Sequence, residues 1–66
     1  MEQAIITNDK GFSKAVNPSD RVTLSLALSG LTKNWGLVQD IAEWCDIASP
    51  GMTYPHAKTF KVQIVA

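Results

Sequence analysis

The stretch RVTLSLALSGLTKNWGLVQDIAEWCDIA, residues Arg21 to Ala48, decides the fold, because its apolar period changes part-way along. In residues 21–29 apolar side chains alternate with small or polar ones. The apolar positions are Val22, Leu24, Leu26 and Leu28. Strict alternation is typical of a strand with one buried and one solvated face. We therefore expect a strand at 21–29 whose buried face carries those four side chains.

From about Lys33 to Ala48 the apolar period becomes 3.6 residues, which predicts an amphipathic helix. Thr32 or Asn34 can cap its start. Pro50 disfavours helical geometry at the residue before it and so ends the helix. The polar half of this helix carries Lys33, Gln39, Asp40, Glu43 and Asp46.

Three weaker strands flank this stretch, at Gln3–Thr7, Phe12–Val16 and Thr59–Val65. The sequence Asn8-Asp9-Lys10-Gly11 has the composition of a hairpin turn. A second turn is expected at 17–20, around Pro18. The chain is thus expected to be one α+β domain over residues 1–66, with a three- or four-stranded, mainly antiparallel sheet. One amphipathic helix would pack on one sheet face, in the order β-β-β-α-β or β-β-α-β.

The composition argues against several functional classes. In 66 residues there are 6 basic and 6 acidic side chains, whereas nucleic-acid-binding proteins usually carry a basic excess. The single cysteine, Cys45, cannot form an internal disulfide, and no apolar run is long enough to span a membrane. The start Met1-Glu2-Gln3 lacks the basic residues of a signal peptide. We expect a cytoplasmic protein with no membrane contact.

The residues that usually support catalysis or metal binding are scarce, so we expect no enzyme, no cofactor and no metal site. One histidine and one cysteine are too few for a zinc site. Cys45 and His56 could form a thiol–imidazole pair. However, Cys45 lies within the apolar arc of the helix, where burial raises a thiol pKa. A packed cysteine and a solvated histidine are the simpler interpretation.

Two charged groups of side chains suggest binding rather than chemistry. Asp40, Glu43 and Asp46 share the exposed side of the predicted helix, and no basic residue lies between Lys33 and Lys58. They form either a solvated face or an acidic stripe for a basic partner. The second group is expected on the outer sheet face, which would be mildly basic but poor in the aromatic residues that stack on RNA bases. Its members are Lys14, Arg21, Lys58 and Lys61.

The chain also has more large apolar side chains than a small core needs. The expected core consists of Val16, Val22, Leu24, Leu26, Leu28, Trp35, Val38, Ile41, Ala42, Cys45, Phe60, Val62 and Ile64. The remainder consists of Leu37, Trp44, Ile47, Met52, Tyr54 and one of Ile5 and Ile6. Trp44 either closes the end of the core or belongs to a contact patch, since Trp is enriched at interface hot spots.

The leading hypothesis is therefore a non-enzymatic protein-binding module that docks on a larger partner. Its contact surface would consist of Leu37, Asp40, Glu43, Trp44 and Ile47. The start Met1-Glu2-Gln3 and the short β–α–β plan resemble small phage-encoded proteins in size and style, which suggests an accessory or inhibitor protein of phage or mobile-element type. The alternatives are a homodimeric structural subunit that buries the same surplus or pairs an edge strand, and a nucleic-acid-binding regulator.

Overall fold

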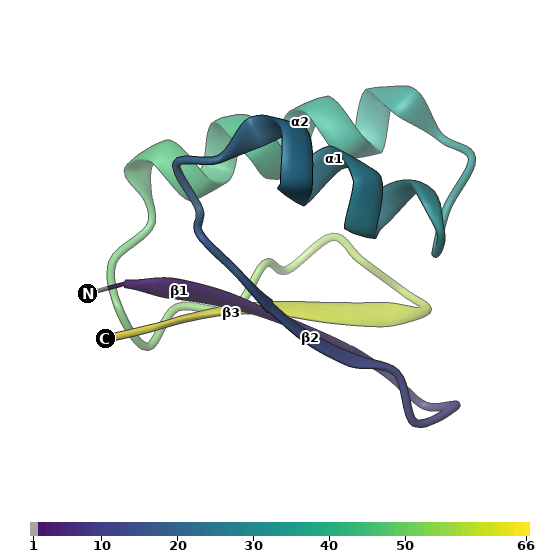
Figure 1. Cartoon of the computed structure of the whole chain (residues 1–66), viewed down its shortest axis with the longest axis horizontal. Helices are drawn as coiled ribbons and strands as arrows, with labels where there is room; N and C mark the ends of the chain where they lie inside the picture. The colour runs from purple at the N-terminus through teal and green to yellow at the C-terminus, as the bar shows by residue number, and fades with distance from the viewer. Residues whose placement is uncertain (1) are drawn as a thin grey trace.

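The computed structural model describes residues 2–66 (Figure 1). Met1, on which part of the signal-peptide argument rests, lies outside them. The chain runs through two strands, two helices and a last strand. These are β1 (Gln3–Asn8), β2 (Ser13–Val16), α1 (Arg21–Ser29), α2 (Trp35–Ile47) and β3 (Phe60–Val65). The α+β class and the antiparallel sheet are confirmed, whereas both predicted element orders are wrong, because the order is β-β-α-α-β.

The predicted hairpin turn between β1 and β2 is confirmed. The side-chain oxygen of Asn8 accepts hydrogen bonds from the backbone N–H groups of Lys10, at 3.0 Å, and Phe12, at 2.9 Å. Gly11 has φ +89°, a left-handed conformation that residues with a Cβ rarely adopt. The turn therefore needs both the amide at its start and the glycine near its end.

The three strands have the order β2-β1-β3, and both pairings with β1 are antiparallel. Beyond β3, the segment 51–54 adds a short fourth row, because the Tyr54 N–H donates to the Val62 carbonyl at 2.8 Å. Gln3 pairs with Val65, so the two ends of the described chain lie side by side (Figure 1). The free edge of the sheet is that of β2, which is only four residues long.

The prediction of a strand at 21–29 is wrong, because these residues form helix α1. Alternating apolar positions give two pairs of residues spaced i, i+4, and the pairs lie on nearly opposite sides of a helix. Leu24 and Leu28 are fully buried, whereas Val22 and Leu26 are 71% and 68% exposed. The alternation therefore marks a helix with apolar side chains on two sides rather than a strand with one apolar face.

Local signals for α1 are present in the sequence around Asp20. The Asp20 carboxylate accepts hydrogen bonds from the backbone N–H of Thr23, at 3.2 Å, and from its hydroxyl, at 2.9 Å. Asp is a strong N-cap residue, and Leu and Ala, which make up four of the nine helix residues, favour helices. The hydrogen bond from the Thr23 backbone also lowers the pKa of the Asp20 carboxyl.

Helix α2 agrees closely with the predicted helix. Asn34 caps it, since its side-chain oxygen accepts from the Leu37 N–H at 3.2 Å. The helix ends at Ile47, ahead of Pro50, as expected. Both helices lie on the same side of the sheet (Figure 1), and they run antiparallel, because Arg21 at the start of α1 pairs with Asp46 near the end of α2. None of the helices in residues 2–66 is long and apolar enough to cross a membrane.

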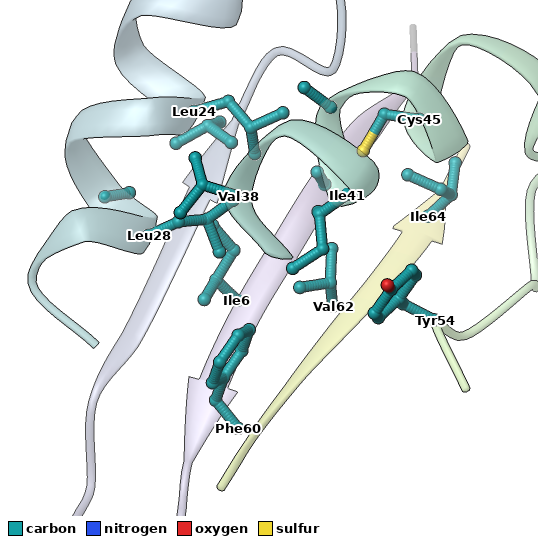
Figure 2. Close-up of a cluster of buried hydrophobic side chains, with 14 residues drawn as sticks. Ile6, Leu24, Leu28, Val38, Ile41, Cys45, Tyr54, Phe60, Val62 and Ile64 are labelled. Carbon is teal, nitrogen blue, oxygen red and sulfur yellow. The ribbon is translucent and has the colours of Figure 1, made fainter. Parts of the chain in front are cut away.

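The core lies between the two helices and one sheet face (Figure 2). Three residues predicted for it, Val22, Leu26 and Trp35, are instead exposed, and the other ten are buried. Ile6 takes a core place, which leaves Ile5 half-buried on the outer face. The buried set consists of Ala4, Ile6, Val16, Leu24, Ala27, Leu28, Val38, Ile41, Ala42, Cys45, Tyr54, Phe60, Val62 and Ile64.

Candidate functional site

The outer side of α2 and the loop that follows it form a surface hollow of about 430 Å³. We call it the α2–loop site. It is lined by Asp40, Glu43, Trp44, Ile47, Tyr54, Pro55 and His56. Four of the five residues predicted as a contact surface thus line one hollow. The fifth, Leu37, is outside this lining and packs half-buried against the core.

Aromatic side chains make up part of the lining of this hollow. Tyr54 is buried, and its ring meets Trp44 edge-to-face, with centroids 5.4 Å apart and planes at 74°. On its other side it meets His56, at 5.7 Å and 80°. Edge-to-face pairs at such distances are favourable beyond the area they bury. The loop is therefore anchored to the helix through Tyr54, and Trp44 stays half-exposed in the lining of the hollow.

A hydrogen bond joins the loop to the helix a second time. The Tyr54 hydroxyl donates to a carboxylate oxygen of Asp40, which lies one helical turn before Trp44. Burial, and then the contact with Asp40, raises the pKa of Tyr54 to about 12. Tyr54 therefore remains a neutral donor over the whole physiological pH range, and Asp40 is held at the rim of the hollow.

The hollow has an acidic rim, and one apolar side chain in its lining is largely exposed to solvent. Asp40 and Glu43 line it without any lysine or arginine. Ile47 is 81% exposed, the highest exposure among the large apolar side chains described. The third carboxylate of the predicted acidic stripe, Asp46, is instead paired with Arg21. No basic residue lies between Lys33 and Lys58 in the sequence, but in the fold Arg21, the first residue of α1, reaches Asp46.

Sequence reasoning missed the contribution of the loop to this site. From the sequence, Tyr54 is expected among the surplus apolar residues and His56 in a solvated loop. Pro55 stands between them and also lines the hollow. The composition Tyr-Pro-His was the available signal, but nothing in the sequence shows that the segment 51–54 pairs with β3. That pairing carries Tyr54 to α2.

The surroundings of Cys45 and His56 give no support to a thiol–imidazole pair. Cys45 belongs to the buried core, where its side chain lies among Ile41 and Ile64 (Figure 2). Burial, with a smaller contribution from Asp46, raises the pKa of the thiol to about 11, so it stays protonated at neutral pH. His56 lines the surface hollow. Among residues 2–66 no cluster of three or more His, Cys, Asp or Glu side chains is placed to hold a metal ion.

The basic sheet face predicted from the sequence does not form. Arg21 lies on α1, and Lys14 lies on the same side of β2 as the core residue Val16. Lys58 and Lys61 do come together, in a hollow of about 280 Å³ at one end of the sheet, but Asp9 lines it too. Phe60 in that lining is buried, so it cannot stack on a base.

No family model, curated protein or solved structure matches this chain. The α2–loop site is therefore interpreted from its own geometry.

Proposed function

We propose that the chain is a non-enzymatic protein-binding module whose α2–loop site receives a segment of a larger partner. The segment would present an apolar side chain next to Lys or Arg. One observation carries this proposal: an 81% exposed Ile47 and a half-exposed Trp44 line the same hollow together with two carboxylates. Buried Trp and a surrounding polar rim are the usual anatomy of an interface hot spot.

The fixed positions of the side chains support this proposal. Tyr54 contacts Trp44 and donates to Asp40, so two of the lining residues are held before any partner arrives. A surface that is already ordered loses less conformational entropy on binding, and more of the contact energy is left as affinity. A loosely attached loop would not offer this advantage.

Charge supports the choice of partner. Asp40 and Glu43 line the hollow together, whereas Asp46 is paired with Arg21 on the side facing α1. An acidic rim attracts a basic segment and repels an acidic one. The attraction would be strongest at low salt, because exposed charges are screened over about 8 Å at physiological ionic strength.

The absence of catalysis is part of the proposal and has two supports. The thiol of Cys45 is protonated and buried, which removes the nucleophile suggested by the sequence. The carboxylates of the α2–loop site belong to exposed residues, Asp40 and Glu43, and lie in an open surface hollow rather than a water-excluded pocket.

A display library of random peptides, selected on the full chain, tests the proposal. We expect the recovered peptides to contain Lys or Arg beside Leu, Ile or an aromatic residue. Binding is then measured by the fluorescence of Trp44 in a Trp35→Phe background, since the chain has two tryptophans and Trp35 is exposed. Ile47→Ser should weaken binding about tenfold, the loss expected for one large apolar side chain.

Two variants serve as matched controls. Met52→Ser also removes an exposed apolar side chain, but one outside the lining of the hollow, so it should leave binding unchanged. Asp40→Asn keeps an oxygen for the Tyr54 hydroxyl and removes one charge, so it should weaken binding only a few-fold. The proposal fails if recovered peptides are acidic, or if Met52→Ser weakens binding as much as Ile47→Ser.

A further inference from the structure

A second uncovered apolar surface lies on α1, away from the α2–loop site. Val22 and Leu26 are spaced i, i+4 and are 71% and 68% exposed, and exposed Ser29 continues the same line. We call these three residues the α1 crest. Leu24 and Leu28 already supply the core contact of this helix. A helix with apolar side chains on two opposite sides is usually covered on both.

The charges around the crest indicate what covers it. Arg21 is the one charged residue within α1, and it is paired with Asp46. The crest is therefore neutral. Exposed Asp20 precedes the helix, and exposed Lys33 follows it in the connection to α2. An antiparallel copy of the same helix would place the acidic end of each copy near the basic end of the other.

From this neutral crest with opposite charges at its two ends, we propose that α1 is a self-association surface whose occupant is a second copy of this chain. A two-fold axis across the crest packs Val22 of each copy against Leu26 of the other. Such a contact is self-complementary, as closed dimers require. Antiparallel helices of four-helix bundles pack through seams with the same i, i+4, i+7 spacing.

The other surfaces suit a second copy less well. The α2–loop site carries Asp40 and Glu43, so two copies meeting there would bring like charges together. The free edge of β2 carries Lys14, and lysine on an edge strand opposes pairing with another strand. The α1 crest has neither obstacle. It is short, since a nine-residue helix is about 13.5 Å long, so the dimer should be weak and reversible.

The test measures the molar mass of the full chain by sedimentation velocity over a hundredfold concentration range. The wild-type chain should pass from monomer to dimer as concentration rises. Leu26→Lys puts a charge against Val22 of the other copy at both ends of the contact and should weaken association at least tenfold. Val22→Asp should do the same against Leu26. An equimolar mixture of the two variants should associate again, because the lysine introduced in one copy then faces the aspartate introduced in the other, while the remaining Val22 and Leu26 pack together.

Control variants distinguish a loss of folding from a loss of the association surface. Both substitutions lie at exposed helical positions, and circular dichroism should show unchanged helix content; Val22→Lys and Leu26→Asp form a second pair if either variant unfolds. Ile47→Lys, the matched change on α2, should leave the dimer intact while abolishing peptide binding at the α2–loop site. A wild-type chain that stays monomeric over the whole range overturns the proposal, as does a dimer that survives both single variants or a mixture that does not associate.

Discussion

The two helices cover the same sheet face, yet their outer surfaces differ in charge and in attachment. The outer side of α1 is a neutral crest on which Val22 and Leu26 are mostly exposed. The outer side of α2 is acidic and is joined to the following loop through Tyr54. Both helices have more apolar surface than the core uses. The two helices differ in the charges that surround this exposed apolar surface.

This difference distinguishes a surface suited to self-association from one suited to a basic partner, which composition alone does not do. A neutral surface is compatible with its own copy, because no like charges meet across a two-fold axis. A surface with two carboxylates, Asp40 and Glu43, opposes its own copy and favours a basic partner. Counting surplus apolar residues predicts that a contact surface exists, and the neighbouring charges predict what binds there.

The largest expected effect tests whether α1 has one buried and one exposed apolar side. Leu28→Ala should lower the free energy of unfolding by about 2–5 kcal/mol, because it leaves a cavity in the core. Leu26→Ala removes the same atoms two residues earlier, from an exposed position, and should change stability by no more than about 0.5 kcal/mol. Urea denaturation at low protein concentration measures both.

This pair of variants also tests the helix itself. In a strand, Leu26 and Leu28 point to the same face, and the two substitutions would have similar costs. Equal losses of stability would therefore contradict the assignment of α1. Because a 66-residue domain is only marginally stable, Leu28→Ala is best measured with a stabilising osmolyte present in both samples.

A smaller effect is expected where the loop joins α2. Tyr54→Phe keeps the ring but removes the hydroxyl that donates to Asp40, and should cost about 1–2 kcal/mol of unfolding free energy. Asp40→Asn retains an acceptor for the hydroxyl and should cost less. If Tyr54→Phe is as stable as the wild-type chain, the loop is held by ring packing alone.

The same contact makes a prediction for alkaline pH. The folded pKa of Tyr54, about 12, is above its ordinary value of 10.0, so folding disfavours the tyrosinate. The stabilisation by the neutral phenol is present below pH 10 and is lost as pH rises towards 12. Tyr54 is the one tyrosine of the chain, so its ultraviolet absorbance reports this titration directly. A midpoint near 10 in the folded protein would contradict the burial of Tyr54.

The smallest effect concerns the connection between the two helices. Both side chains of the Arg21–Asp46 pair are about half-exposed, at 57% and 47%. Exposed ion pairs contribute little, so Arg21→Ala should lower the free energy of unfolding by about 0.5 kcal/mol or less. A double-mutant cycle with Asp46→Ala isolates the pair, and a coupling that persists in high salt would show a stronger link between the helices than the exposure indicates.

Local signals were enough to predict most elements of the fold. The hairpin turn, α2 and β3 follow from Asn8 and Gly11, from the 3.6-residue period, and from the alternation ending at Val65. The error at 21–29 has a definite cause. Alternation over four apolar positions fits a strand with one apolar face and also a helix with two. The capping residue Asp20 and the leucine-rich composition favour the helix, and the alternation alone does not exclude it.

The candidate site was predicted only in its helical part. Asp40, Glu43, Trp44 and Ile47 share one side of α2 because helical periodicity fixes their directions. The loop residues could not be placed from the sequence, since the position of Tyr54 depends on backbone hydrogen bonds between residues distant in the chain. For the same reason the pairing of Arg21 with Asp46 required the fold.

The pairing of Gln3 with Val65 has a practical consequence for rearranging the chain. Since both ends leave the sheet as neighbours, a short linker can connect them, and new ends can be opened at the exposed Asp9–Lys10 turn without cutting a strand or helix. By the same geometry, the domain could be spliced into a surface loop of a carrier protein, where its two connections would enter and leave side by side.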